Sequence, residues 1–198
     1  MVVFGITGGS GSGKTSVSKM LEKLGVHIID TDVIAHEIVE PNSDCLNELV
    51  DYFGDSILND DKTLNRKKLA SIAFSDKQKT EALSNITHKY IKAEVVKDIN
   101  TTDAELVGID GAVIIGSNVE PLCEFIVSVI ADKQSRITRI KTRDNITDEQ
   151  AIQRINAQND GSLLDAMKNE EIGHLELKKG CLVYQNFDGR NGLGTGRV

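Results

Sequence analysis

No segment limits the possible folds of this chain as strongly as the glycine-rich run Gly8-Gly-Ser-Gly-Ser-Gly-Lys-Thr15. Just before it, residues 2–7 form a short apolar run, which predicts a buried strand. Just after it, apolar side chains recur at the spacing of one helical face until Gly25 ends the pattern, namely Val17, Met20, Leu21 and Leu24. A strand, the pattern G-x-x-x-x-G-K-T and a helix in this order define a P-loop.

This motif predicts a site for a nucleoside triphosphate and its magnesium ion. Glycines let consecutive N–H groups surround a phosphate without Cβ clashes, and the helix that follows adds the positive end of its dipole. We expect Lys14 to neutralise the β- and γ-phosphates and the Thr15 hydroxyl to bind Mg²⁺. A flexible loop that merely contains Lys-Thr is disfavoured because both flanking elements match. The residues predicted to bind the nucleotide are Gly9, Gly11, Ser12, Gly13, Lys14, Thr15 and Ser16.

The remaining pattern predicts one α/β domain over residues 1–198. A second strand at 26–29 completes a parallel strand–helix–strand unit. Residues 33–100 show helical periodicity almost throughout, which indicates a helical insertion able to receive a substrate. Strands return at 106–110, with 113–115 as a candidate continuation, and at 125–131. Helices are predicted at 132–144 and 147–158, the second with Thr147 and Gln150 as a capping box, and the glycine-rich tail from Asp188 predicts a loop.

Three carboxylates follow predicted strands. Asp30 and Asp32 come directly after the strand at 26–29, at the edge where open α/β sheets bind ligands. There they could order Mg²⁺ waters or accept a proton from an attacking hydroxyl; alternatively, Asp32 caps a helix that starts at Val33. Asp110 ends the next strand, where it is either a magnesium-associated carboxylate or a turn residue before Gly111.

Arginines and histidines supply further candidates. Arg136, Arg139 and Arg143 are spaced by three and four, so they share a helix face, and Arg154 lies on the next helix. Such a face could close as a lid over the γ-phosphate and stabilise the charge in transfer; the alternative is a solvated basic surface. On the predicted insertion, His36 and His88 could face a substrate.

Composition narrows the class of protein. The chain has 198 residues and a net charge of −7, which disfavours a nucleic acid as partner. Its apolar runs are too short to span a bilayer, and no signal peptide is visible at Met1, so we expect no membrane partner. Three scattered cysteines, Cys45, Cys123 and Cys181, predict small buried side chains in a reduced, cytoplasmic protein. The oligomeric state stays open, with a monomer favoured.

Several motifs together resemble the dephospho-CoA kinase family. After the P-loop, Asp30-Thr-Asp-Val-Ile-Ala-His36 is similar to that family's D-x-D-x-I-A element. The likeness continues, in order, through residues 63–69 with Phe74, through Ile86-Thr-His88, through Arg139-x-x-x-Arg143-Asp144 and to Arg154-Ile-x-x-Gln158. It covers roughly residues 2–160, which a chance P-loop would not do.

The resemblance implies a phosphotransferase with an alcohol acceptor, in which ATP phosphorylates the 3′-hydroxyl of the ribose of dephospho-CoA, the last step of CoA biosynthesis. It implies a three-layer P-loop NTPase fold with a five-stranded parallel sheet, a CoA-binding insertion at 33–100 and a lid at 132–160. The catalytic residues would be Lys14, Asp32 as general base, Arg139 and Arg143; Thr15 and Asp110 would serve the metal. The small-molecule substrate would meet Asp32, His36, Arg66 and His88, and Asn186 would lie in a loop near the adenine.

Two alternatives remain open. The first is another P-loop kinase that acts on a nucleoside or a different small molecule. The second is a relative that binds ATP without turnover.

Overall fold

The computed structural model describes residues 1–157, 172–177 and 181–187, which belong to two compact units. The first unit contains Met1–Ile29, Asp103–Gly116 and the described residues from Glu120 onward. The second contains Asp30–Thr102 with Ser117–Val119. Each unit is considered separately below. The tail from Asp188, predicted to be a loop, lies outside the described residues.

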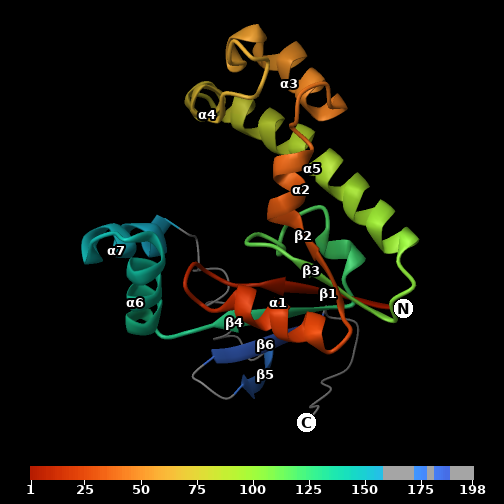
Figure 1. Cartoon of the computed structure of the whole chain (residues 1–198), viewed down its shortest axis with the longest axis vertical. Helices are drawn as coiled ribbons and strands as arrows, with labels where there is room; N and C mark the ends of the chain where they lie inside the picture. Colours follow the sequence, from red (N-terminus) through yellow and green to blue (C-terminus); the bar gives the residue numbers. More distant parts are fainter. Residues whose placement is uncertain (158–171, 178–180, 188–198) are drawn as a thin grey trace. The chain divides into compact units, whose positions relative to one another are not determined.

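A six-stranded sheet forms the centre of the first unit (Figure 1). The strands β2, β3, β1 and β4 make its parallel part, and β6 and β5 continue it beyond β4. In this register Ile6 of β1 lies beside Asp110 of β3, and Thr7 lies beside Ser128 of β4. The bounds are β1 Val2–Thr7, β2 His27–Asp30, β3 Leu106–Asp110, β4 Phe125–Ile130, β5 Ile172–Leu177 and β6 Cys181–Phe187.

The expected five-stranded parallel sheet is confirmed only in part, because four of the six described strands form its parallel part. β6 runs antiparallel to β4, and β5 runs antiparallel to β6. Only three residues separate β5 from β6, and a connection that short can join antiparallel strands but not parallel ones, which need a crossover of a dozen or more residues. The candidate strand at 113–115 is also absent, because β3 ends at Asp110.

Helix α1 (Lys14–Lys23) packs on the sheet through fewer apolar residues than its sequence suggests. Val17 is buried with Phe4 and Ile6 of β1, and Leu21 is half-buried against the same cluster. Met20 and Leu24 are 58% and 78% exposed, although we expected them on the buried face. The helix is rotated so that Ser18 is buried instead, and Leu24 lies beyond the last helical residue.

Two further helices of the first unit, α6 (Lys133–Asp144) and α7 (Asp148–Ala157), pack against each other. Their contact is a small apolar cluster made by Ile137, Ile140, Ala151 and Ile155. The predicted capping box is confirmed: Gln150 N donates to Thr147 Oγ1 at 3.3 Å, and Thr147 N donates to Gln150 Oε1 at 3.1 Å. The last residues of the predicted lid, 158–160, lie outside the described part of the chain. The short helix η2 (Glu120–Leu122) precedes β4.

The second unit is helical, as the periodicity of residues 33–100 predicted. Its helices are α2 (Thr31–Glu37), α3 (Asp44–Phe53), η1 (Asp55–Ile57), α4 (Arg66–Ala73) and α5 (Lys77–Thr101). The side chains of Ser43, Asn65 and Asp76 accept hydrogen bonds from backbone N–H groups at the starts of α3, α4 and α5. The core of this unit is formed by Leu46, Leu49, Ile57, Leu69, Ala73, Ile86 and Val95.

Candidate active site

The loop between β1 and α1 has the conformation that its glycines allow. Gly11 and Gly13 have φ angles of +76° and +102°, in the left-handed region that side chains with a Cβ rarely adopt. A Cβ on Gly8 would lie 2.4 Å from the carbonyl oxygen of Val129 on β4, so only glycine fits there. Gly13 is the N-cap of α1, and the loop therefore leads directly into the positive end of that helix.

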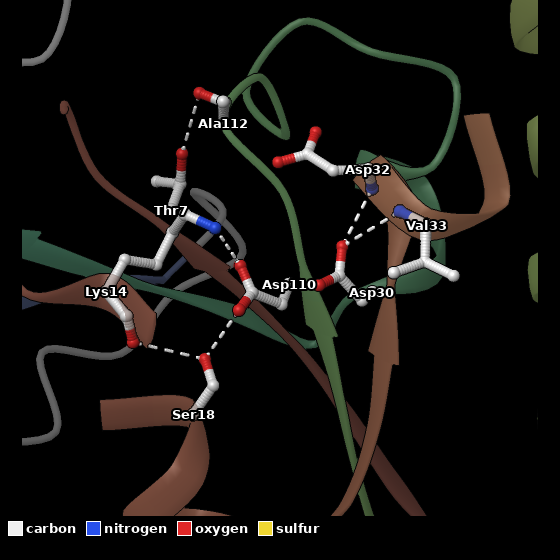
Figure 2. A network of polar contacts seen from close by, with 8 residues as sticks. All are labelled: Thr7, Lys14, Ser18, Asp30, Asp32, Val33, Asp110 and Ala112. Atoms are coloured by element: carbon white, nitrogen blue, oxygen red, sulfur yellow. Dashed lines mark hydrogen bonds and ion pairs between the residues drawn. The ribbon is translucent and has the colours of Figure 1, made fainter. Parts of the chain in front are cut away.

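A buried polar network joins the start of α1 to the end of β3 (Figure 2). Lys14 Nζ forms an ion pair with Asp110 Oδ1, and the two side chains are only 15% and 6% exposed. Ser18 Oγ donates to the other oxygen, Asp110 Oδ2, at 2.6 Å. Sequence reasoning picked out Lys14 and Asp110 but missed Ser18, whose position one helical turn after Lys14 was the available signal.

The other nucleotide residues predicted from the motif divide by exposure. Ser12 is buried, with 1% of its surface exposed, and its N–H donates to the Gly9 carbonyl oxygen at 3.0 Å. Thr15 and Ser16 lie exposed on the first turn of α1. The exposed hydroxyl of Thr15 can therefore reach a ligand bound in the loop.

Helix α6 brings two of the predicted arginines to the same loop. Arg136 Nε donates to the Ser10 carbonyl oxygen at 2.9 Å. Arg139 Nη1 donates to the carbonyl oxygens of Gly11 and Ser12, both at 3.0 Å. Both arginines thus contact the backbone of the loop, although Arg139 itself is exposed.

The remaining two arginines of this region have a different partner. Arg143 Nε and Nη2 donate to the two carboxylate oxygens of Asp144 at 2.7 and 2.9 Å, and Arg154 Nη1 also contacts Asp144. The hydrogen bonds from Arg143, followed by the charge of Arg154, hold the pKa of Asp144 below its usual value. Arg143 therefore binds its own neighbour within α6, and it is Arg154 of α7 that joins α7 to the last residue of α6.

In the second unit, Asp30 and Asp32 have distinct roles at the start of α2 (Figure 2). Asp30 Oδ1 accepts hydrogen bonds from the N–H groups of Asp32 and Val33 at 2.8 and 3.2 Å, so Asp30 is the N-cap. The alternative interpretation, in which Asp32 caps a helix starting at Val33, is wrong, because the helix already starts at Thr31. Asp32 is exposed, and within the described residues its carboxylate makes no hydrogen bond or ion pair.

The predicted acceptor residues are also in the second unit, but on separate helices. His36 is exposed on α2, with Nδ1 2.7 Å from the Asp32 carbonyl oxygen. Arg66 is the exposed first residue of α4. His88 is half-buried on α5, and its carbonyl oxygen accepts a hydrogen bond from Asn118 Nδ2 at 2.5 Å. The structure does not bring these three side chains into contact with one another.

A pocket of about 250 Å³ lies in the second unit, and its lining does not include these predicted residues. It is lined by Glu37, Ile38, Ser43, Asp44, Cys45, Tyr90 and Glu94. Beside it, Glu48 Oε2 accepts hydrogen bonds from Lys89 Nζ at 2.6 Å and Tyr90 Oη at 2.7 Å, which lower the pKa of Glu48. Burial of Cys45 raises its pKa to about 11, so this thiol stays protonated at neutral pH.

Three further predictions concern the metal, the membrane and Asn186. Among the described residues, no group of three or more His, Cys, Asp or Glu side chains could hold a metal ion by itself. No described helix is long and apolar enough to cross a bilayer. The backbone of Asn186 lies in β6, paired with Ile126 of β4, and not in the loop that the family resemblance implied.

Comparison with known proteins identifies one family and several similar sequences. The family model described as dephospho-CoA kinase matches residues 2–166. The chain is 39% identical over 157 residues to the dephospho-CoA kinase of Listeria monocytogenes, covering 78% of each chain. It is also 39% identical over 163 residues to that of Corynebacterium jeikeium, covering 81% of this chain and 84% of that one.

Two solved structures have a similar fold. The crystal structure of TT1252 from Thermus thermophilus superposes with a TM-score of 0.69 at 26% identity, covering 79% of this chain and 80% of that chain. The dephospho-CoA kinase from Campylobacter jejuni gives a TM-score of 0.56 at 25% identity, covering 84% and 83%. With a family match over most of its length and relatives at this level of identity, the chain belongs to the dephospho-CoA kinase family, whose members phosphorylate dephospho-CoA.

Proposed function

We propose that this chain transfers the γ-phosphoryl group of ATP to the 3′-hydroxyl of the ribose of dephospho-CoA, which yields CoA and ADP. The observation that carries the proposal is the loop Gly8–Thr15, with left-handed Gly11 and Gly13 before α1, in a chain of this family. The overall class proposed is a three-layer P-loop NTPase, with four parallel strands in its sheet.

The loop and its neighbours suit a nucleotide with Mg²⁺. Backbone N–H groups and the start of α1 favour phosphate oxygens. Lys14 would leave Asp110 and turn to the β- and γ-phosphates, where its charge is worth more in the transition state. Magnesium bound to phosphates takes only one or two protein groups, which fits the exposed Thr15 hydroxyl and the Asp110 carboxylate that Lys14 releases. When bound, Mg²⁺ neutralises charge on the phosphates.

Asp32 is the proposed general base that accepts the proton of the attacking hydroxyl. Its carboxylate is exposed and uncommitted among the described residues, which a base that must reach a substrate requires. Asp30 is the N-cap of α2 and so stabilises the first turn of this helix, which contains Asp32.

The helices of residues 33–100 are the proposed acceptor-binding region, with His36, Arg66 and His88 as contacts. Residues 132–160 are the proposed lid, with Arg139 and Arg143 as the arginines that would reach the phosphates on closure. Closure would have to exchange the contacts of Arg139 with Gly11 and Ser12, and those of Arg143 with Asp144, for phosphate oxygens. The cytoplasmic location and the monomeric state stay predictions.

The test is ADP release from Mg-ATP with dephospho-CoA, compared with adenosine and AMP as acceptors and with no acceptor. We expect turnover with dephospho-CoA alone. Turnover only with adenosine or AMP would show that the protein is a kinase with a different acceptor from the one proposed. ATP binding without turnover on any acceptor would contradict the proposal in favour of a non-catalytic relative.

A further inference from the structure

The first turn of α6 is packed directly on the phosphate-binding loop. Three consecutive loop carbonyls, those of Ser10, Gly11 and Ser12, accept hydrogen bonds from α6, the first from Arg136 and the next two from Arg139. The backbones of the loop and of α6 also lie close together at Gly11 and Arg136. A Cβ on Gly11 would lie 2.8 Å from the Arg136 carbonyl oxygen and 3.0 Å from the Arg136 Cα, so no larger residue fits between loop and helix.

The contact of Arg136 fixes more than one carbonyl. In a trans peptide the C=O and the following N–H point in opposite directions across one rigid plane. Holding the Ser10 oxygen toward α6 therefore points the Gly11 N–H away from α6. With Gly11 and Gly13 both left-handed, successive N–H groups of such a loop can form a concave site for an anion.

Arg136 differs from the neighbouring arginines in its surroundings. It is half-buried, whereas Arg139 and Arg143 are exposed, and its Nε lies 2.9 Å from the Ser10 oxygen. The sequence alone left open whether Arg136 lies on a face that closes over the γ-phosphate or on a solvated basic surface. The structure directs it to the loop backbone.

We propose that Arg136 is a positioning residue for the phosphoryl donor: it holds the Ser10 carbonyl so that the loop presents its N–H groups to the β-phosphate, and it touches no phosphate itself. This inference rests on the proposed use of ATP. A residue that shapes the β-phosphate site affects ATP and ADP alike, because both carry that phosphate. A residue that contacts the γ-phosphate affects ATP alone.

The test compares dissociation constants for Mg-ADP and Mg-ATP, and kcat at saturating ATP, in the full-length wild type and three variants. Arg136→Met removes the donors and keeps an apolar stem. Arg136→Lys keeps a charge and a donor. Lys23→Met, on the last turn of α1 and outside both the loop and the proposed lid, removes an exposed charge and is the matched control.

We expect Arg136→Met to raise both dissociation constants by about tenfold, the order expected when a charge-assisted hydrogen bond is lost. The kcat at saturating ATP should stay within about twofold of wild type, Arg136→Lys should recover part of the affinity, and Lys23→Met should match wild type. If Arg136→Met does not fold, Arg136→Lys alone tests the inference. We then expect its dissociation constants for Mg-ATP and Mg-ADP to rise by the same factor, smaller than that expected for Arg136→Met.

Three results would overturn the inference. Unchanged affinities would show that the loop keeps its shape without Arg136. Weakening of ATP but not ADP would place Arg136 on the γ-phosphate, and a lower kcat with unchanged affinities would make its role one in the transition state. A wild type that binds neither nucleotide would instead refute the proposed function, a result that the wild-type titration alone identifies.

Discussion

Asp110 shows at the scale of single residues how the site is held together before any nucleotide binds. Its buried carboxylate is shared between Lys14 and Ser18, both on α1. A buried carboxylate is tolerated only with such partners, because desolvation without them is costly. The lysine partner is also the proposed phosphate ligand, so Ser18 is the partner that stays when Lys14 turns to ATP.

We therefore predict that Ser18→Ala lowers the free energy of unfolding by about 1–3 kcal/mol, the usual cost of leaving a buried polar group with one donor fewer. Urea unfolding measures this change. Ser71→Ala, at an exposed position of α4, is the control and should stay within about 0.5 kcal/mol of wild type. In the background Asp110→Ala, which removes the acceptor, the effect of Ser18→Ala should shrink, since contacting residues couple; full additivity would rule out the hydrogen bond as the cause.

Asp32 leads to a prediction about rate. Asp32→Asn keeps the size of the side chain but removes the proton acceptor, so kcat should fall on the order of 10²-fold or more. The dissociation constant for ATP should change little, because Asp32 is proposed to act on the acceptor hydroxyl. Steady-state kinetics and nucleotide titration measure the two quantities, with Asp51→Asn, an exposed acid on α3, as control. A variant that retains full kcat would exclude Asp32 as the base.

At the scale of elements, two glycines that flank α1 offer a matched comparison. Gly25 ends the helix with φ +89°, and the N–H groups of Gly25 and Val26 donate to the carbonyls of Glu22 and Leu21, a Schellman ending. No atom lies within 4 Å of a Cβ placed there. Gly11 has a similar φ of +76°, but its Cβ would press on the backbone of α6.

Gly25→Ala should therefore lower the free energy of unfolding only by the conformational cost of a left-handed residue with a side chain, about 1–2 kcal/mol. Gly11→Ala should lower the free energy of unfolding clearly more than Gly25→Ala does. It should also weaken ATP binding, because α6 must move away from the loop. Thermal unfolding and ATP titration of both variants measure the difference. If the two variants lose the same stability and ATP binding is intact, α6 moves away from the loop at little cost in free energy.

The junction of α6 and α7 should depend on pH. Arg143 and then Arg154 lower the pKa of Asp144 in the folded protein, so folding favours its ionised form. The stabilisation is complete above the unfolded pKa of about 3.9 and is lost as the pH falls through the lower folded value. In urea unfolding, Asp144→Asn should be less stable than wild type at pH 7, and the difference should shrink as the pH falls below the unfolded pKa. A stability difference that does not change with pH would show that the ionisation of Asp144 does not stabilise this junction.

At the scale of the whole molecule, the proposed division of labour follows the two units. The phosphate-binding loop, Asp110 and the arginines belong to the first unit, and Asp32 and the helices of residues 33–100 belong to the second. In this proposal a chain with a net charge of −7 would bind anionic substrates in both units, so local donors and cations would have to outweigh the overall charge.

Amide hydrogen exchange measured with each substrate separately would test this division. ATP alone should slow exchange in residues 8–18, and dephospho-CoA alone should slow it within residues 33–100, since bound ligand stabilises the structure that it contacts. At a ligand concentration of about 100 times Kd the stabilisation amounts to about 2.7 kcal/mol. Protection by dephospho-CoA confined to the first unit would contradict the assignment of the helical region.

The sequence by itself determined the features that depend on neighbours along the chain. The P-loop between a strand and a helix, the Thr147–Gln150 capping box and the helical stretch of residues 33–100 all follow from local spacing and turn chemistry. Asp110 at the end of a strand was visible for the same reason. These patterns need no knowledge of what packs against them.

Tertiary structure alone decided which groups meet. The rotation of α1 buries Ser18 on Asp110, 92 residues away, and leaves Met20 exposed, although the apolar spacing favours the opposite. Arg136 contacts Ser10 across 126 residues. The pairing of β6 with β4 likewise joins distant segments. Such contacts are chosen by the competition of all elements for burial and hydrogen-bond partners, which no local spacing records.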